Sequence, residues 1–162
     1  MKLRATNRYD ASVDRVFALL TDPDQLAAMN AAVGASDCQL VSQDDRGGAP
    51  WLVTSRKVTV DLPGFARKVM QPTNTVVQTD DWAAPEADGS RTCRYQVEVK
   101  GVPSRIDGTM TLRAGGDGCR QDIDAEVKVS IPLLGGRLEK FAVESGEKEI
   151  AAQAQWIAAH AR

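Results

Sequence analysis

The sequence predicts an α+β fold in which an antiparallel sheet of about seven strands lies against one long C-terminal helix. Two observations lead to this class. Residues 131–162 contain no proline after Pro132 and repeat apolar side chains at helical spacing. Residues 37–131 instead alternate with a period of two and are divided by turn residues. A sheet with one apolar face needs a cover, and the apolar stripe of the helix supplies it.

The residue pattern of the N-terminal part predicts one strand followed by two short helices. Residues 2–10 alternate between apolar and polar side chains, as in a half-buried strand. Ser12 is placed to cap a short helix. Asp22 is placed to cap a second helix, with Pro23 in its first turn and Gly34 at its end. Almost no linker separates the two helices.

Six further strands are expected between residues 37 and 131. Their ranges are 37–45, 51–60, 74–82, 92–100, 105–114 and 119–131. The links between them are short and rich in glycine and proline, which indicates an antiparallel meander. The last two strands alternate most clearly, so one face of the sheet is predicted to be dry and the other wet. The inward faces of 51–60 and 74–82 are not assigned by the pattern.

The long helix carries one apolar stripe on a helical wheel. At roughly 100° per residue, the stripe contains Leu138, Ala142, Gly146, Ile150, Trp156 and Ile157. The opposite side contains Arg137, Lys140, Glu144, Glu147, Lys148, Gln155 and Arg162. The sequence therefore predicts an amphipathic helix with one buried and one solvated face.

Composition narrows the class of protein. The length of 162 residues fits a single domain covering 1–162, and a net charge of −2 gives no electrostatic reason to expect nucleic acid or an anionic membrane as partner. We expect no signal peptide and no membrane span, hence a cytoplasmic protein that is a monomer or a weak homodimer. Three widely spaced cysteines predict neither a disulfide framework nor a zinc site.

Two motifs carry a family resemblance. Residues 11–23 (ASVDRVFALLTDP) resemble the opening of many START-like proteins, and residues 131–140 (IPLLGGRLEK) are similar to a START-like family of unknown function found mainly in actinobacteria. The whole chain resembles the helix-grip fold of the START/Bet v 1 (SRPBCC) superfamily. That resemblance implies a curved sheet wrapped around the last helix, with a cavity in which relatives hold lipids, sterols, polyketides or quinones.

Eight residues are predicted to contact a ligand in such a cavity. They are Tyr95, Val97, Met110, Ile123, Ala142, Glu149, Gln153 and Trp156. Glu149 and Gln153 lie within the apolar stripe, where they are expected to meet the polar end of a ligand, with Trp156 as an apolar wall. The alternative for Glu149 is a place at the rim or a pair with an arginine of the sheet. The Tyr95 hydroxyl either faces the cavity or bonds the backbone.

For several other candidate cavity residues, the sequence leaves two interpretations open. Asn7, Tyr9 and Gln121 share inward strand faces and are either cavity or core residues. Phe65, Val69 and Met70 lie in a short helix or lid-like loop at 62–70, and either gate the cavity or pack against the sheet edge. His160, the sole histidine, is expected to be exposed near the chain end and is rejected as a general base. No metal or other cofactor is predicted.

Three functions remain open. The leading hypothesis is binding or transport of a small hydrophobic molecule without catalysis. An alternative is an enzyme of the polyketide cyclase/aromatase or hydratase kind, with Glu149 and Tyr95 as the acid–base pair. The third is a protein-interaction module like the co-chaperone members of the superfamily, which would present an exposed apolar patch or a filled pocket.

Overall fold

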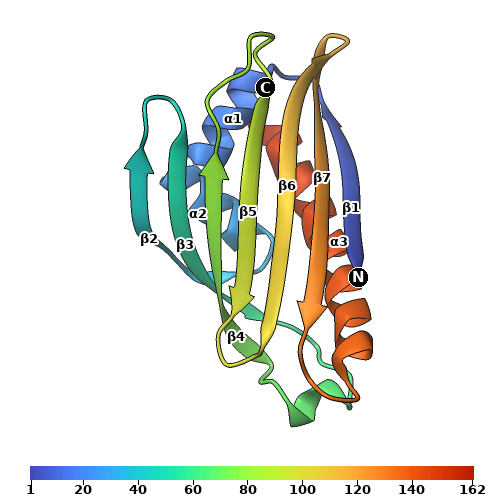
Figure 1. Ribbon diagram of the computed structural model, residues 1–162. Coiled ribbons are helices and arrows are strands. Elements are labelled where there is room, and N and C mark those ends of the chain that lie inside the picture. Colours follow the sequence, from blue (N-terminus) through green and yellow to red (C-terminus); the bar gives the residue numbers. More distant parts are fainter.

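The computed structural model describes residues 1–162 and contains one seven-stranded antiparallel sheet (Figure 1). The strand order is β1-β7-β6-β5-β4-β3-β2. The strands are β1 (Lys2–Tyr9), β2 (Ser36–Asp45), β3 (Pro50–Thr59), β4 (Thr73–Trp82), β5 (Arg91–Val99), β6 (Ser104–Gly115) and β7 (Gly118–Val129). From β2 to β7, strands that follow one another in the chain are paired, and β1 pairs with β7 at the opposite edge of the sheet from β2. The predicted meander is confirmed.

Two short helices follow β1 as the capping residues indicate. Helix α1 is Val13–Thr21, and the Ser12 hydroxyl accepts a hydrogen bond from the backbone N–H of Arg15. Helix α2 is Pro23–Ala32, and the Asp22 carboxylate accepts from the N–H groups of Asp24 and Gln25. These side chains satisfy backbone donors that the first turn of a helix leaves free.

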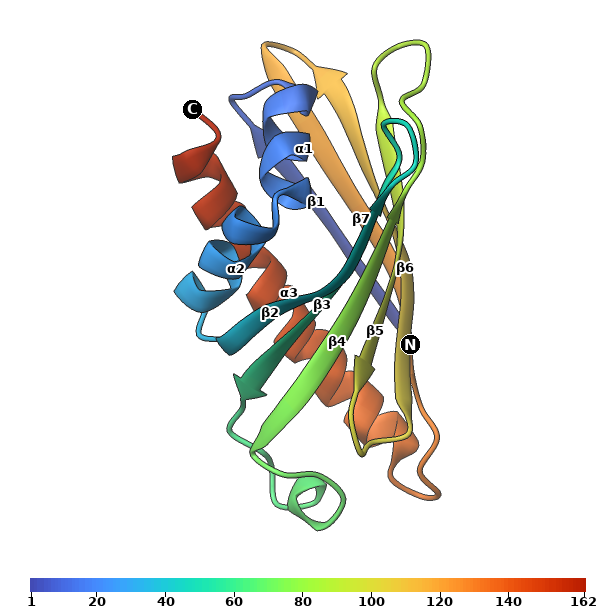
Figure 2. The same ribbon diagram turned by 90° about the vertical axis from the view of Figure 1, so that its left-hand side faces the viewer.

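Helix α3 (Gly135–His160) crosses the concave face of the curved sheet, and α1 and α2 close one end of the same face (Figure 2). Figure 2 shows the strands bending around α3, so the helix-grip expectation is confirmed. The main core cluster joins the inward faces of the strands to all three helices; Val16, Leu112 and Ile157 are almost completely buried in it. The solvated side chains expected on α3 are exposed.

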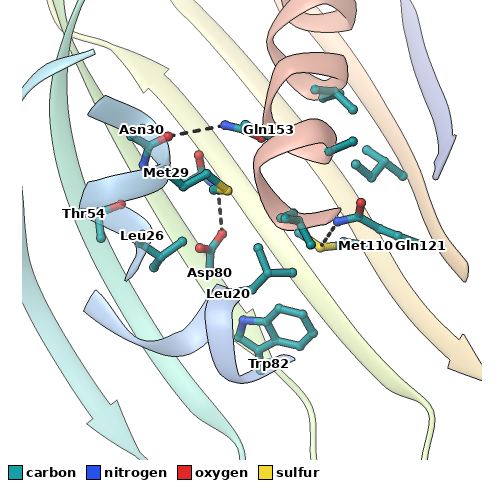
Figure 3. Close-up of a pocket in the computed structure, with 15 residues that line it drawn as sticks. Leu20, Leu26, Met29, Asn30, Thr54, Asp80, Trp82, Met110, Gln121 and Gln153 are labelled. Carbon is teal, nitrogen blue, oxygen red and sulfur yellow. Dashed lines mark hydrogen bonds between the residues drawn. The ribbon is translucent and has the colours of Figure 1, made fainter. Parts of the chain in front are cut away.

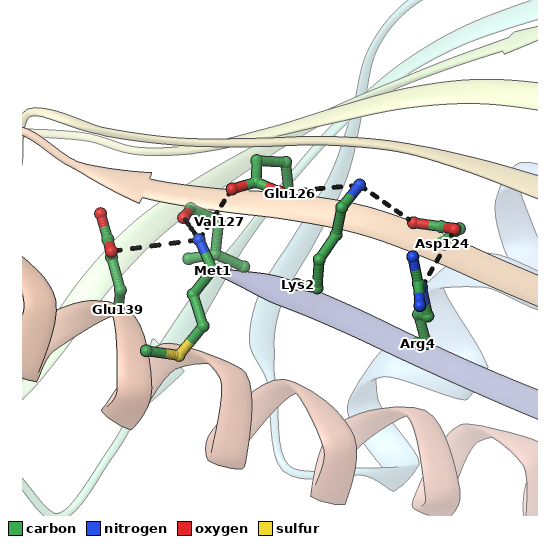
Figure 4. Close-up of polar contacts among 7 residues, drawn as sticks. All are labelled: Met1, Lys2, Arg4, Asp124, Glu126, Val127 and Glu139. Atoms are coloured by element: carbon green, nitrogen blue, oxygen red, sulfur yellow. Dashed lines mark hydrogen bonds and ion pairs between the residues drawn. The ribbon is translucent and has the colours of Figure 1, made fainter.

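Alternation in β7 makes one sheet face apolar. Every second residue from Cys119 to Val129 is buried, and the residues between them are half-buried or exposed. The exposed side carries ion pairs between β1 and β7: Lys2 lies 3.5 Å from Asp124, and Arg4 lies 3.2 Å from the same residue (Figure 4). Exposed pairs of this kind contribute about 0–1 kcal/mol each. The β6–β7 sheet is dry inside and wet outside, as predicted.

The hairpin between β6 and β7 supports a stability prediction. Gly115 and Gly118 are cross-strand partners, but only Gly118 is crowded, because a Cβ there would collide with the Tyr9 carbonyl oxygen. We expect Gly118→Ala to lower the free energy of unfolding by roughly 3 kcal/mol or more. Gly115→Ala is the matched control: a Cβ there meets nothing within 4 Å. Equal urea-unfolding midpoints for the two variants would contradict the close β1–β7 approach.

The segment between β3 and β4 contains a short 3-10 helix, η1 (Ala66–Lys68). Leu62 and Ala66 are buried in a second core cluster with Val129 of β7 and Leu138 of α3. Phe65, Val69 and Met70 pack on this cluster. The segment thus packs on the end of β7 and the start of α3, and its Met70 also lines a chamber between the sheet and α3.

Candidate ligand cavity between the sheet and α3

Three neighbouring chambers, together called the hollow, lie between the sheet and α3. The lower chamber lies along the first half of α3 and has a volume of about 170 Å³. The middle chamber has a volume of about 120 Å³, and the upper chamber, beside α1 and α2, about 50 Å³. Neighbouring chambers share lining residues, so they adjoin one another along α3. The three volumes together just exceed the lower end of the roughly 300–1,000 Å³ typical of small-molecule pockets.

The lower chamber is the most apolar of the three. Twelve of its eighteen lining residues are hydrophobic. Strands β3 to β7 contribute valines and an isoleucine, α3 contributes Leu138, Phe141 and Ala142, and Met70 closes one side. Valine is favoured on strands because its branched side chain fits the pleated surface, so the sheet builds a smooth aliphatic wall here. Such a wall suits an aliphatic or aromatic body rather than a polar one.

A chain of six polar side chains, which we call the polar bridge, crosses the hollow from the sheet to the helices. Its members are Asp80 and Gln78 of β4, Arg56 of β3, Glu149 and Gln153 of α3, and Asn30 of α2. Gln78 Nε2 donates to Asp80 Oδ1 at 2.9 Å, and Arg56 Nη1 donates to Gln78 Oε1 at 3.1 Å. On the helix side, Gln153 Nε2 donates to Glu149 Oε1 at 3.2 Å and to Asn30 Oδ1 at 3.3 Å.

Arg56 is the centre of the polar bridge. It is only 6% exposed, and its Nη2 donates to Glu149 Oε1 at 3.1 Å. The Glu149 side chain is 33% exposed, so the ion pair reaches the edge of the hollow rather than lying fully inside it. Glu149 therefore pairs with an arginine of the sheet, the alternative considered for it. Arg56 Nε is buried without a hydrogen-bond partner.

The upper chamber contains the most unusual carboxyl group of the protein. Asp80 is 5% exposed, and burial raises its pKa to about 6, although the hydrogen bond from Gln78 and the charge of Arg56 oppose the rise. Figure 3 shows Asp80 directed into the chamber, between Met29 and Leu20 and near Trp82. The Trp82 indole N–H is buried without a partner. A carboxyl group that titrates near neutrality can act as acid or base.

Seven of the eight predicted contact residues line the hollow. Val97 and Glu149 border the lower and middle chambers, and Ala142 borders the lower one. Tyr95 borders the middle chamber, while Met110, Ile123 and Gln153 border both the middle and the upper chamber. Their contact with a ligand stays a prediction.

Trp156 does not line any of the three chambers, which corrects its expected place as an apolar wall. Its ring stacks on the exposed His160 ring, with centroids 4.0 Å apart. The cavity-facing side of α3 rotates along the helix, from Ala142 and Glu149 to Ala154 and Ile157, because the sheet beneath it curves and twists. A wheel with one fixed direction misplaces residues near the end of such a helix.

The inward polar residues of β1 and β7 form a separate network. Asn7 Nδ2 and the Tyr9 hydroxyl both donate to Gln121 Oε1, at 3.0 and 2.8 Å. Gln121 Nε2 points to the Met110 sulfur at 3.1 Å, and Gln121 lines the upper chamber (Figure 3). Burial raises the pKa of Tyr9. Of these three residues, Gln121 is the one that borders the cavity.

Sequence reasoning did not identify Asp80 and Gln78, and it left the direction of Arg56 open. Strand β4 places polar Gln78 and Asp80 inward beside Val76 and Trp82, so no alternation of apolar and polar residues marks its inner face. One signal was present. A tryptophan at position 82 is rarely left in water, and a period of two then places Asp80 and Gln78 on the same side.

Solved structures similar to this chain share the helix-grip fold. A protein of Thermus thermophilus (TTHA0849) has a TM-score of 0.71 at 15% identity, covering 99% of this chain and 97% of that chain. A STAR-related lipid transfer protein fragment of Xanthomonas axonopodis has a TM-score of 0.67 at 20% identity, covering 95% and 84%. Ara h 8.0201 has a TM-score of 0.62 at 13% identity, covering 97% of each. The fold is that of START and Bet v 1-like proteins.

Within that fold class, the chain belongs to the family described as "Protein of unknown function (DUF2505)", which matches residues 4–159. No curated protein matches the chain. None of the helices is both long enough and apolar enough to span a membrane. The resemblance to a START-like family of unknown function is therefore confirmed at the level of the family.

Proposed function

We propose that the protein binds or carries a small hydrophobic molecule, of the lipid, sterol, polyketide or quinone class, in the hollow between the sheet and α3. The lower chamber carries this proposal, because its walls are mainly aliphatic and the adjoining middle chamber is lined by polar groups as well. The apolar body of the ligand lies along Phe141 and Ala142, and its polar end lies near Arg56, Glu149 and Gln153. The proposal places the protein in the cytoplasm.

The fold supports this proposal in a general way. One of the similar structures is named as a lipid transfer protein. Pockets for such molecules are mainly apolar with a few placed polar groups. The hollow has this composition, because the polar bridge lies between the mainly apolar lower chamber and the upper chamber. A ligand longer than the lower chamber would reach the polar bridge and exchange contacts with it.

A substitution that fills the lower chamber tests the proposal. We expect Ala142→Trp to weaken uptake of the apolar fluorophore N-phenylnaphthylamine by at least about tenfold, because the indole would occupy the chamber. Ala151→Trp is the matched control, since Ala151 lies on the exposed side of the same helix. Fluorescence titration gives both affinities.

A ligand panel measured by thermal unfolding and native mass spectrometry accompanies this test. A true ligand stabilises the wild-type protein by roughly 3 kcal/mol at about a hundred times its Kd. If lipids, sterols, aromatic polyketides and quinones all leave the wild-type protein unchanged, and the fluorophore does not bind, the proposal is wrong.

Asp80 favours a second candidate, an enzyme that moves protons in the same cavity. Its pKa of about 6 and its place in the upper chamber make it a better acid–base group than Glu149, which is engaged with Arg56. Burial also raises the pKa of Tyr95, a middle-chamber residue, to about 12. Release of a bound polyketide or enone in chemically changed form would favour this candidate, and its recovery unchanged would favour binding alone.

A further inference from the structure

The connection between β7 and α3 presents a leucine to solvent in a costly conformation. Leu133 is 100% exposed and has a φ of 67°. A non-glycine residue in the left-handed region costs on the order of 1 kcal/mol. No buried contact offsets this cost, because the whole side chain stands in water. The connection therefore displays an apolar side chain at the surface that adds nothing to the packing of the core.

Three connections meet at the end of the molecule where Leu133 lies, and we call this surface the basal end. They are residues 60–72, 100–103 and 130–137, the last range including the first residues of α3, and all lie at the bottom of Figures 1 and 2. Contacts join them. The Ser130 N–H donates to the Pro103 carbonyl oxygen at 2.8 Å, and the Arg137 guanidinium lies 4.0 Å from the centre of the Phe65 ring. The basal end is one packed surface.

The basal end is positively charged although the whole chain has a net charge of −2. Its connections carry Arg67, Lys68, Lys100 and Arg137 against one carboxylate, Asp61. All four cations are exposed, and none of them takes part in the ion pairs of the protein. Basic residues scattered along the sequence are thus gathered by the fold.

We propose that the basal end docks on a membrane surface containing anionic lipid, with Leu133 entering the interface and the four cations facing phosphate groups. An exposed leucine among cations fits this partner, because apolar burial and attraction to anionic headgroups act together there. A nucleic acid would use the cations but would leave Leu133 in water.

The docked orientation has a consequence for the cavity. Val60, Met70, Val102 and Ser104, which line the lower chamber, belong to or adjoin the same connections. The lower chamber would then lie next to the bilayer. Docking does not depend on the proposed ligand-binding function, and it is measured without any ligand.

Vesicle flotation tests the proposal with the intact chain of 162 residues. We expect binding to phosphatidylcholine vesicles that contain a quarter phosphatidylglycerol, little binding to pure phosphatidylcholine, and a loss of binding at high salt. Leu133→Gly should weaken binding at least about tenfold, by loss of a buried leucine side chain. Its midpoint of unfolding should stay equal or rise, because glycine accepts a positive φ at no cost.

Charge variants complete the test. Arg67→Gln with Lys68→Gln should weaken binding by roughly fivefold for each cation removed. Arg8→Gln with Lys148→Gln is the matched control, because these exposed cations lie outside the basal end. The proposal is overturned if Leu133→Gly binds vesicles like the wild type, if the control pair is equally impaired, or if DNA binds as tightly without dependence on Leu133. Leu133-dependent dimerisation without vesicle binding would also overturn it.

Discussion

Replacing Asp80 with asparagine is expected to stabilise the protein at neutral pH by roughly 2 to 3 kcal/mol. Burial raises the pKa of Asp80 from the usual 3.8 to about 6 in the folded state. At a pH between these two pKa values, the Asp80 carboxyl is protonated more often in the folded state than in the unfolded state. The free energy of unfolding therefore falls as pH rises through this range. The asparagine side chain has no charge to bury, and its oxygen still accepts the hydrogen bond from Gln78.

The pH dependence makes this expectation specific. Urea unfolding at pH 4 should find Asp80→Asn and the wild type nearly equal, and the advantage of the variant should grow through pH 6 and reach its full size by pH 7.5. Asp81→Asn is the control, since Asp81 is outward-facing, about half exposed, and paired with Arg46. A variant that is less stable than the wild type at pH 7.5 would mean that Asp80 is well solvated or well paired.

Replacing Arg56 with methionine is expected to destabilise the protein by about 3 kcal/mol. The change removes the cation of the polar bridge, leaves Gln78 Oε1 without its donor, and leaves Glu149 Oε1 with Gln153 alone as donor. It also removes a charge that lowers the pKa of Asp80, so the carboxyl becomes more costly to ionise. Urea unfolding at pH 7.5 measures the loss.

Two comparisons separate this effect from a general sensitivity to substitution. Glu149→Gln should cost only about 1 kcal/mol, because glutamine keeps an acceptor for Arg56 and the position is 33% exposed. Arg120→Met, at an exposed ion pair with Asp122, should change stability by less than about 0.5 kcal/mol. If Arg56→Met is no more harmful than Arg120→Met, the polar bridge does not hold the sheet and α3 together.

The element order was predictable from sequence because local signals agreed with the fold. Ser12 and Asp22 cap the helices that they were expected to cap, and β6 and β7 alternate as strongly as a half-buried sheet requires. Each of these signals depends on neighbours within a few residues. Strand ends therefore fell within two residues of their observed positions.

The centre of the site was not predictable in the same way. Arg56 lies inward on β3 because Gln78 and Glu149, on two other elements, accept its hydrogen bonds. Such a partnership exists only after β3, β4 and α3 have come together, and no local pattern in 51–60 indicates it. The error at Trp156 has a related cause, because the curvature of the sheet decides which side of α3 faces the cavity.

The location of a bound ligand tests the central claim most directly. We suggest titrating isotope-labelled protein with N-phenylnaphthylamine, or with the strongest stabiliser of the panel, and following the NMR signals of the backbone and methyl groups. Binding between the sheet and α3 predicts the largest shifts at Val99, Val102, Phe141 and Ala142, with smaller shifts at Glu149. Shifts confined to the outer sheet face around Arg94 and Asp124, with the lower chamber unchanged, would contradict it.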